Sequence, residues 1–273
     1  MKPFEQKFFK IGRCIYCDTT AGPLTDEHII PLALGGKTIL KKAVCEPCRV
    51  VTSRYESNPI QENWLQMRAA LNLPSRHRKL KEMIFPLDVV LADGSKTTLQ
   101  LKGKETPGLA QFLEYAPPAI LTRAPYTSGI VITGVKLIGF GMDAKALKEK
   151  HGIKGFTHTT TQRGNDFEKM VAKIAYCLVI AILGPDCFRD RCILPTLMGK
   201  RDDIGYWMGC DPAGTYSSPI GVLPGTFATK LDILDPDGMR IVMVRVKFFA
   251  ASEAPEYLVV VGTLKPGFDP TNP

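Results

Sequence analysis

Short apolar runs near the N-terminus give way to a longer helical pattern. Residues 24–34, LTDEHIIPLAL, predict a short strand, and Gly35-Gly36 predicts the turn that follows it. TILKKAV, residues 38–44, is the expected returning strand. Residues 49–73 then carry a pattern compatible with helix, which Pro59 either breaks or restarts as a second helix. We therefore expect two strands followed by helix in this part of the chain.

The pattern changes after about residue 85. Residues 88–103 alternate around an Asp93-Gly94 turn, which is a strong hairpin signal. Residues 128–141 predict a further strand, residues 229–249 a second hairpin, and residues 256–264 a last strand. Most of these strands follow one another through short turns, so we expect mostly antiparallel pairing.

The longest helical pattern covers residues 164–185. Asn165 is the expected N-cap, with Glu168 three residues later, and Gly184-Pro185 ends the pattern. Apolar residues at helical spacing predict one buried stripe, made of Phe167, Met170, Val171, Ile174, Leu178 and Ile182. We expect this amphipathic helix to pack on the antiparallel sheet.

These patterns predict an α+β protein with a boundary near residue 85. Residues 1–85 would form a small N-terminal module with a basic helical tail. Residues 86–273 would form a larger α+β domain whose role, in substrate binding, sensing or oligomerisation, the pattern leaves open. A chain of 273 residues is long enough for both parts to bury a core.

The positive charge is concentrated in the first part. Residues 1–85 contain 14 Lys and Arg against 8 Asp and Glu, whereas the remaining residues contain 21 against 19. A basic end on a nearly neutral body favours contact with a polyanion over a merely soluble surface. The most apolar segment, residues 170–184, is interrupted by Lys173 and is too short to cross a bilayer. With no signal-peptide pattern at the N-terminus, we expect a cytoplasmic protein.

Two C-x-x-C pairs supply the strongest chemical signal. They are Cys14 with Cys17 and Cys45 with Cys48, about 30 residues apart. Each pair offers two thiolates from one tight turn, and two pairs complete a closed tetrahedral zinc site. We expect this zinc to be structural, because four sulfur ligands leave no open position. Cys187, Cys192 and Cys210 are expected to be ordinary or buried thiols rather than a second site.

Between the two pairs, Asp26, Glu27 and His28 follow one another directly. An imidazole can take a proton from water, and a carboxylate can hold a hard divalent ion against phosphate oxygens. These are components for phosphodiester hydrolysis. Strand alternation places Asp26 on the same face as His28, so the acid that assists His28 stays open between Asp26 and Glu27.

The arrangement of C-x-x-C, EHIIPLALGG and a second C-x-x-C leading into a helix resembles the HNH endonucleases, the zinc-stapled ββα-metal nucleases. The resemblance covers residues 14 to about 57, and uncharacterised bacterial and phage HNH proteins with a C-terminal extension look similar to the whole chain. It implies that His28 is the general base and that Glu27 helps to bind one Mg²⁺ or Mn²⁺, with Asp26 in reserve.

Two positions depart from the family pattern. An Asn usually braces the loop before the second Cys pair, and Lys42 stands near that place; Asn or His usually follows the pair as a metal ligand, and Arg49 stands there. Arginine cannot bind a cation but can clamp a phosphate. Glu56, two helical turns beyond Arg49, is the expected substitute ligand. Basic residues expected to contact nucleic acid are Lys41, Lys42, Arg49, Arg54, Arg76, Arg78 and Lys79.

We thus predict a metal-dependent endonuclease that acts on nucleic acid, with DNA favoured over RNA. The alternative is a catalytically inactive, zinc-stabilised module that only binds nucleic acid. A third interpretation makes residues 86–273 the functional centre, through a ligand, a regulatory partner or a second copy of the chain.

Overall fold

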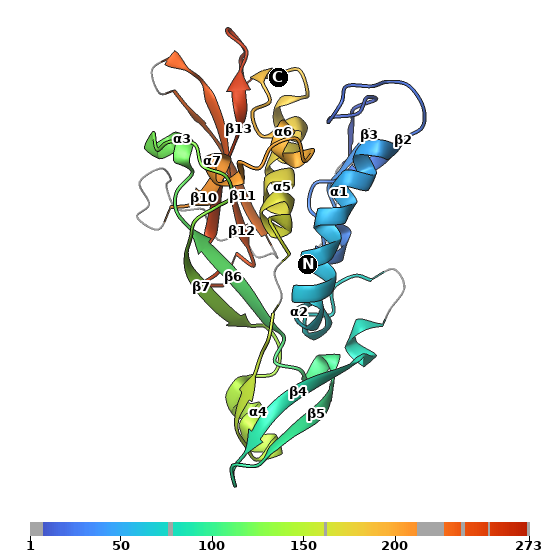
Figure 1. Cartoon of the computed structure of the whole chain (residues 1–273). Helices are drawn as coiled ribbons and strands as arrows, with labels where there is room; N and C mark the ends of the chain where they lie inside the picture. Colours follow the sequence, from blue (N-terminus) through green and yellow to red (C-terminus); the bar gives the residue numbers. More distant parts are fainter. Residues whose placement is uncertain are drawn as a thin grey trace.

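The computed structural model describes residues 8–75, 79–160, 163–211, 227–235, 238–250 and 252–271. It combines helices with several small, mostly antiparallel sheets, as expected for the α+β class (Figure 1). No helix in these ranges is long and apolar enough to cross a membrane.

The N-terminal unit is a three-stranded sheet followed by a helix. The strand order is β1-β3-β2, with β1 parallel and β2 antiparallel to the central strand. Its elements are β1 (Phe8–Lys10), β2 (Leu24–His28), η1 (Leu32–Leu34), β3 (Ile39–Cys45) and α1 (Glu46–Asn58). The predicted strand is therefore shorter than residues 24–34 suggested, because the chain after His28 turns into the short 3-10 helix η1. The Gly-Gly turn is confirmed: Gly35 has a φ of 86°, and a Cβ on Gly36 would lie 1.9 Å from the Ile30 carbonyl oxygen.

Pro59 starts a new helical segment, which is the second of the two predicted outcomes. The segments after α1 are the π-helical turn η2 (Pro59–Asn63), α2 (Leu65–Ala70) and η3 (Leu80–Glu82). Trp64 stands between η2 and α2 and is only 1% exposed; its ring packs against those of Phe112, Phe167 and Phe248. The large apolar side chains of this segment thus anchor it to the rest of the protein.

The C-terminal body is an antiparallel sheet covered by the long helix α5 (Asp166–Leu183), as predicted (Figure 1). The strand order is β10-β13-β12-β11, and β9 also pairs with β13. The body comprises β9 (Phe188–Asp190), α6 (Leu194–Leu197), α7 (Ile204–Trp207), β10 (Met208–Cys210), β11 (Phe227–Leu234), β12 (Ile241–Phe248) and β13 (Glu256–Leu264). Both predicted features of the tail, the hairpin β11–β12 and the last strand β13, are confirmed.

Two smaller units come from the part of the sequence between the N-terminal unit and the body. One is the hairpin of β6 (Leu109–Tyr115) and β7 (Ile132–Gly139), with α3 (Ala119–Thr122) in its connection. The other, called the outlying unit, has its own small apolar core. It contains β4 (Ile84–Leu91), β5 (Lys96–Lys102), η4 (Gly103–Glu105), α4 (Ala144–His151) and β8 (Ile153–Thr157). The hairpin predicted around Asp93-Gly94 joins β4 to β5 and is confirmed.

The predicted role of Asn165 at the start of α5 is wrong in its detail. Asn165 does occupy the N-cap position, but its side chain donates to Asp202 instead of capping the helix. Glu168 is fully buried and accepts a hydrogen bond from Tyr115. The apolar stripe also ends early, because Ile182 is 46% exposed. Asp202 and Tyr115 are distant in the sequence from Asn165 and Glu168, so local spacing cannot report these two contacts.

The N-terminal unit and the body share one core. Buried residues from Cys14 to Met67 and from Ala110 to Leu264 belong to a single apolar cluster, and α1 packs along α5 (Figure 1). Near the loop that carries Cys14 and Cys17, Arg191 binds Asp18 through two hydrogen bonds of 2.9 Å. At the other end, Arg163 pairs with Glu62 at 2.7 Å. The boundary predicted near residue 85 falls inside β4, at the start of the sheet formed by β4, β5 and β8, and independent folding of residues 1–85 stays a prediction.

Candidate functional site

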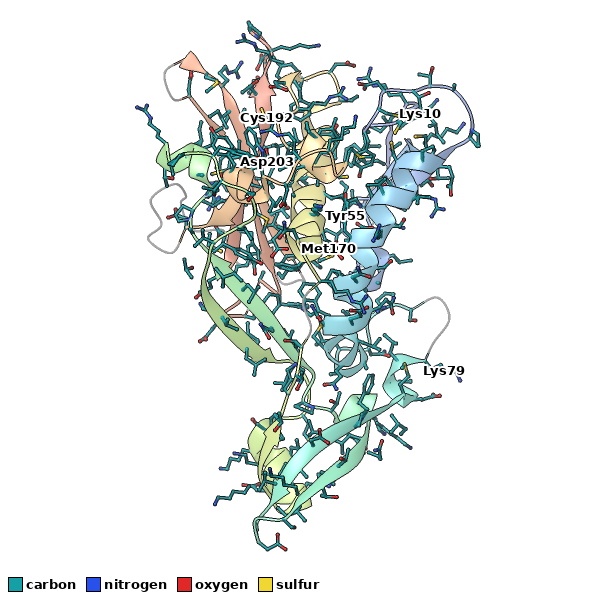
Figure 2. All side chains as sticks on the ribbon, in the orientation of Figure 1. Lys10, Tyr55, Lys79, Met170, Cys192 and Asp203 are labelled. Carbon is teal, nitrogen blue, oxygen red and sulfur yellow. The ribbon has the colours of Figure 1, made fainter. Side chains whose placement is uncertain are left out.

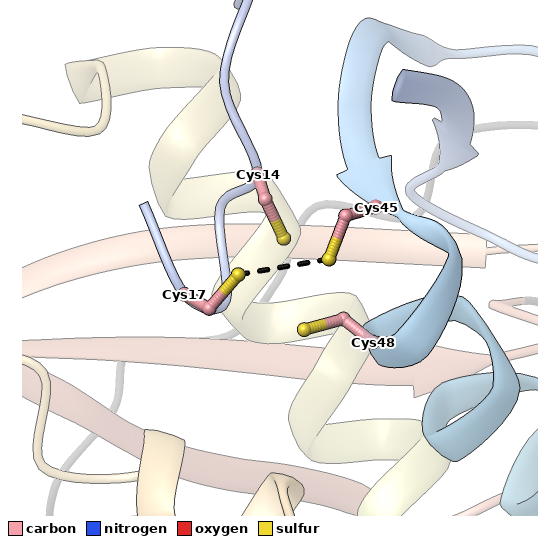
Figure 3. Close-up of side chains that lie close together, drawn as sticks. All are labelled: Cys14, Cys17, Cys45 and Cys48. Carbon is pink, nitrogen blue, oxygen red and sulfur yellow. Dashed lines mark hydrogen bonds between the residues drawn. The ribbon is translucent and has the colours of Figure 1, made fainter. Parts of the chain in front are cut away.

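Four cysteine side chains converge at the start of α1. Cys14 and Cys17 come from the loop before β2, Cys45 ends β3, and Cys48 lies in the first turn of α1 (Figure 3). Their four sulfur atoms all lie within 4.8 Å of one another, and the Cys17 and Cys45 sulfurs are 3.6 Å apart. Tetrahedral zinc with Zn–S bonds of about 2.3 Å needs sulfurs about 3.8 Å apart, so the residues fit the ion.

The close approach of the four sulfur atoms also affects their ionisation. Burial, together with the neighbouring Cys45 thiol, raises the pKa of Cys48 far above its ordinary value. Four clustered thiolates would therefore repel one another without a metal ion between them. A bound metal ion would tie the loop that carries Cys14 and Cys17 to the start of α1. The zinc site predicted from the C-x-x-C pairs is thus brought together by the fold.

A cleft of about 860 Å³ lies beside this cluster, between β2 and α1. All five residues that the sequence proposed for the chemistry line it, namely Asp26, Glu27, His28, Arg49 and Glu56. They come from segments about 20 residues apart in the chain, and the ββα arrangement places them around one space. The cleft is therefore the candidate active site.

His28 stands at the end of β2, with its side chain half-buried at the cleft wall. The next residue continues the ladder, because the Ile29 amide donates to the Thr38 carbonyl at 3.1 Å. The backbone on both sides of His28 is therefore held in place. This position suits a group that must meet a substrate at a defined point.

Asp26 points away from the protein interior and braces a bulge in β3. Its carboxylate accepts from the Lys41 ammonium at 2.7 Å and from the Lys42 backbone amide at 3.0 Å. Lys42 has a φ of 50°, which is the left-handed conformation of the bulge. The hydrogen bond from Lys41 lowers the pKa of Asp26. Asp26 thus braces the loop before the second C-x-x-C pair, which an Asn usually braces in the HNH pattern.

Glu27 points the other way, into the interior, and is only 6% exposed. Its carboxylate forms an ion pair with the ammonium of Lys173, which comes from the middle of α5. Glu56 of α1 pairs with the same ammonium at 2.8 Å. One lysine of the body therefore binds both acids that the sequence proposed as ligands of a divalent ion.

Lys173 also donates a hydrogen bond to the backbone carbonyl of His28. Its side chain is fully buried. Burial disfavours the ammonium, but the adjacent Glu27 and Glu56 carboxylates hold the pKa of Lys173 well above its ordinary value. Lys173 is thus a charged group that connects β2, α1 and α5 directly behind the cleft. The sequence offered one sign of this role, a lysine inside the most apolar helix.

Arg49 directly follows the second C-x-x-C pair, at the position where the HNH pattern usually has a metal ligand. Its guanidinium forms two hydrogen bonds of 2.6 Å with the Glu46 carboxylate, and 44% of its side chain is exposed. An exposed pair of this kind contributes little to stability, so a phosphate can compete for the guanidinium. Arg49 therefore offers the cleft an anion-binding group.

Arg68 is a second arginine on the cleft wall that sequence reasoning missed. It is 2% exposed and donates to the carbonyls of Ala33 and Pro74, each at 2.9 Å. Among the described residues, no carboxylate forms an ion pair with it. Burial lowers the pKa of its guanidinium. Arg68 fastens the turn after β2 to α2 and so holds the shape of the cleft.

A divalent ion does not fit beside Glu27 in this arrangement. Mg²⁺ and Mn²⁺ need several oxygen ligands, but the Glu27 and Glu56 carboxylates are both paired with an ammonium, Asp26 braces the bulge, and Arg49 carries no ligand atom. The Lys173 ammonium would repel an ion about 4 Å away by about 8 kcal/mol at the effective dielectric of a protein site, which offsets part of the attraction by the two carboxylates. The structure therefore pairs Glu27 with Lys173 where the sequence proposed a metal ion.

The predicted nucleic-acid contacts divide into four groups. Arg49 lines the cleft; Lys42, Arg54 and Lys79 are exposed outside it, and Lys41 is engaged by Asp26. Arg76 and Arg78, with His77 between them, lie outside the described residues.

The later cysteines do not form a second site. All eight cysteines are described and free of disulfides, and Cys187 and Cys210 are buried thiols whose pKa is raised by burial to about 12. In the described part of the chain, the four N-terminal cysteines are the one group that meets the spacing for a metal site.

Comparison with known proteins identifies the N-terminal unit. Residues 14–63 match the family model described as HNH endonuclease. The match covers the four-cysteine cluster, the cleft residues of β2 and α1, and the π-helical turn η2. No curated protein and no solved structure matches the chain.

Proposed function

Proceeding from the HNH endonuclease unit at residues 14–63, we propose that this protein hydrolyses phosphodiester bonds in nucleic acid, with DNA as its substrate. The observation that carries the proposal is the cleft, where His28 and Arg49 face one space on a zinc-clamped ββα scaffold. A general base and a phosphate-binding group on opposite sides of a cleft are the minimum for this reaction.

In the proposed reaction, Arg49 leaves Glu46 and binds the scissile phosphate. The His28 imidazole takes a proton from water while the water oxygen attacks phosphorus, the bond from phosphorus to the leaving oxygen breaks, and the leaving oxygen takes a proton from the solvent. The guanidinium neutralises charge that develops on the phosphate oxygens. In HNH nucleases a Mg²⁺ or Mn²⁺ ion stabilises the leaving oxygen. Glu27 is bound to Lys173 in this chain, so we derive no step through such an ion.

Charge and environment support the remaining parts of the proposal. Exposed Lys42 and Arg54 extend the basic surface beyond the cleft, which suits the backbone of a polyanion. Free cysteines suit a reducing compartment, so the proposal places the protein in the cytoplasm. We further propose that residues 86–273 support the site from behind through α5. Binding of a partner or of a second copy of the chain by this body stays a prediction.

The test of the proposal is a cleavage assay with supercoiled plasmid, single-stranded DNA and RNA. The full chain, verified to carry about one zinc ion, is incubated with each substrate in Mg²⁺, in Mn²⁺ and in EDTA. We expect cleavage of DNA in preference to RNA. A folded, zinc-loaded protein that cuts none of the three substrates would overturn the proposal and favour the inactive binding module.

Nucleic-acid binding should depend on the exposed face of α1. We expect Arg49→Ala/Arg54→Ala to weaken DNA binding and to reduce the slope of log affinity against log salt by about 2, because each lost phosphate contact removes about one unit. The measurement is a fluorescence-anisotropy titration at several salt concentrations. Lys145→Ala/Lys148→Ala on α4 is the matched control, since it removes two exposed cations from another helix. An equal loss in both variants would show that α1 makes no specific contact.

A further inference from the structure

A buried ionic cluster lies behind the candidate cleft, where β2, α1 and α5 meet. At its centre, the Lys173 ammonium contacts the carboxylates of Glu27 and Glu56 and the backbone carbonyl of His28. Tyr55, labelled between α1 and α5 in Figure 2, borders the same region and is 4% exposed. The cluster joins three segments that lie far apart in the sequence.

The three contacts resemble the coordination of a metal ion. Two carboxylates and one carbonyl oxygen converge on a single positive centre, which is the set of ligand types that hard divalent cations use. Here the positive centre is an ammonium, which donates three hydrogen bonds and has no lone pair to share. The His28 carbonyl accepts a hydrogen bond from it, and the two carboxylates form ion pairs with it.

Lys173 is held in this place by the helix that carries it. Its neighbours in α5, Ala172 and Ile174, are both fully buried, and α5 packs against β12 and β13 on its other side. Withdrawal of the ammonium would leave two carboxylates without their cation. The positive charge is therefore an integral part of the site.

We propose that Lys173 is the resident cation of the candidate active site and replaces the divalent ion at Glu27 and Glu56. Lys173 is a positioning residue, because it acts through the two carboxylates and the backbone of His28 and does not reach the cleft. It keeps Glu27 and Glu56 from binding a divalent ion. One statement rests on the proposed function: cleavage should continue when zinc-loaded protein is given no Mg²⁺ or Mn²⁺.

The test measures bound metal and does not depend on cleavage. Zinc-loaded full-length protein is titrated with Mn²⁺, and free Mn²⁺ is followed by electron paramagnetic resonance. The variants are Glu27→Gln, Lys173→Met, Lys173→Met/Glu27→Gln and, as a matched control, Lys169→Met, which removes a positive charge one helical turn away. Zinc content and thermal unfolding verify that each variant folds.

We expect the wild type and Lys169→Met to bind no Mn²⁺ at Glu27. Glu27→Gln should therefore leave the amount of bound Mn²⁺ at its wild-type value. Lys173→Met should gain one bound Mn²⁺ per chain, and the double variant should lose it again. A wild type that binds one Mn²⁺ in a Glu27-dependent manner would overturn the proposal, and so would a folded Lys173→Met that gains none. If Lys173→Met fails to fold, the comparison of wild type with Glu27→Gln decides the question.

This outcome is separate from the proposed function. A protein that cuts no nucleic acid fails the cleavage assay, yet the Mn²⁺ titration still reports whether a divalent ion binds at Glu27. A protein that cuts DNA and binds Mn²⁺ through Glu27 supports the nuclease and refutes the resident cation.

Discussion

Replacement of Cys48 with serine is expected to release the zinc ion and to unfold the N-terminal unit. Cys48 is buried, and its sulfur completes a cluster whose members lie within 4.8 Å of one another. Structural zinc contributes on the order of 10 kcal/mol to small zinc-dependent folds, and the shared core here retains part of that stability. We therefore expect a loss of about 5 kcal/mol in the free energy of unfolding, or a fall in Tm of about 10–20 °C.

The measurement combines zinc content with thermal unfolding of the full chain. Cys192→Ser is the matched control, because Cys192 is half-buried and lies outside the cluster, with a contact of 3.9 Å to the Asp190 carbonyl oxygen. The control should keep its zinc ion and change Tm by no more than about 3 °C. If Cys48→Ser kept a full complement of zinc and the wild-type Tm, the four-cysteine site would be refuted.

Replacement of His28 with alanine is expected to lower the cleavage rate by about 10²–10⁴-fold, the usual contribution of a general base. The fold should survive, because the contact that Lys173 makes here is with the His28 backbone carbonyl, which alanine retains. Zinc content, Tm and DNA affinity should therefore stay near the wild-type values. The measurement is the initial rate of plasmid cleavage, together with these three controls.

His151→Ala is the matched histidine substitution for this experiment. His151 ends α4 in the outlying unit, which has a core of its own, and its loss should leave the cleavage rate unchanged. Equal losses of rate in both variants would mean that His28 acts through general stability. A full rate in His28→Ala would remove it from the mechanism.

The sequence reported those features that depend on local spacing. The C-x-x-C pairs located the metal cluster, the Asp93-Gly94 turn located a hairpin, and Gly35-Gly36 located the turn after β2. Each of these features is determined by residues a few positions apart.

Features that depend on distant partners were not accessible from spacing. Glu27 and Glu56 meet a lysine more than 100 residues later in the chain, so a motif that ends near residue 57 cannot report their environment. Asn165 and Glu168 find their partners in Asp202 and Tyr115, so the expected capping arrangement does not form. A charged residue in an apolar helix was the one local sign, because a buried ammonium must find compensating partners.

The single core shared by the N-terminal unit and the body follows from the same long-range contacts. Helix α5 supplies the surface on which α1 packs, and Arg191 of the body binds Asp18 of the loop that carries Cys14 and Cys17. A small module with little core of its own gains stability from such a surface. The body thus supports the candidate site, in addition to any role in binding a partner.

The most direct test is the initial rate of supercoiled plasmid cleavage by zinc-loaded wild type, with His28→Ala in parallel, with added Mg²⁺ and without any added divalent ion. We expect wild type to cut in both conditions and His28→Ala to cut about 10²–10⁴-fold more slowly in both. Cleavage by His28→Ala at the wild-type rate, or no cleavage by a folded wild type in either condition, would contradict the central claim that this cleft hydrolyses nucleic acid through His28.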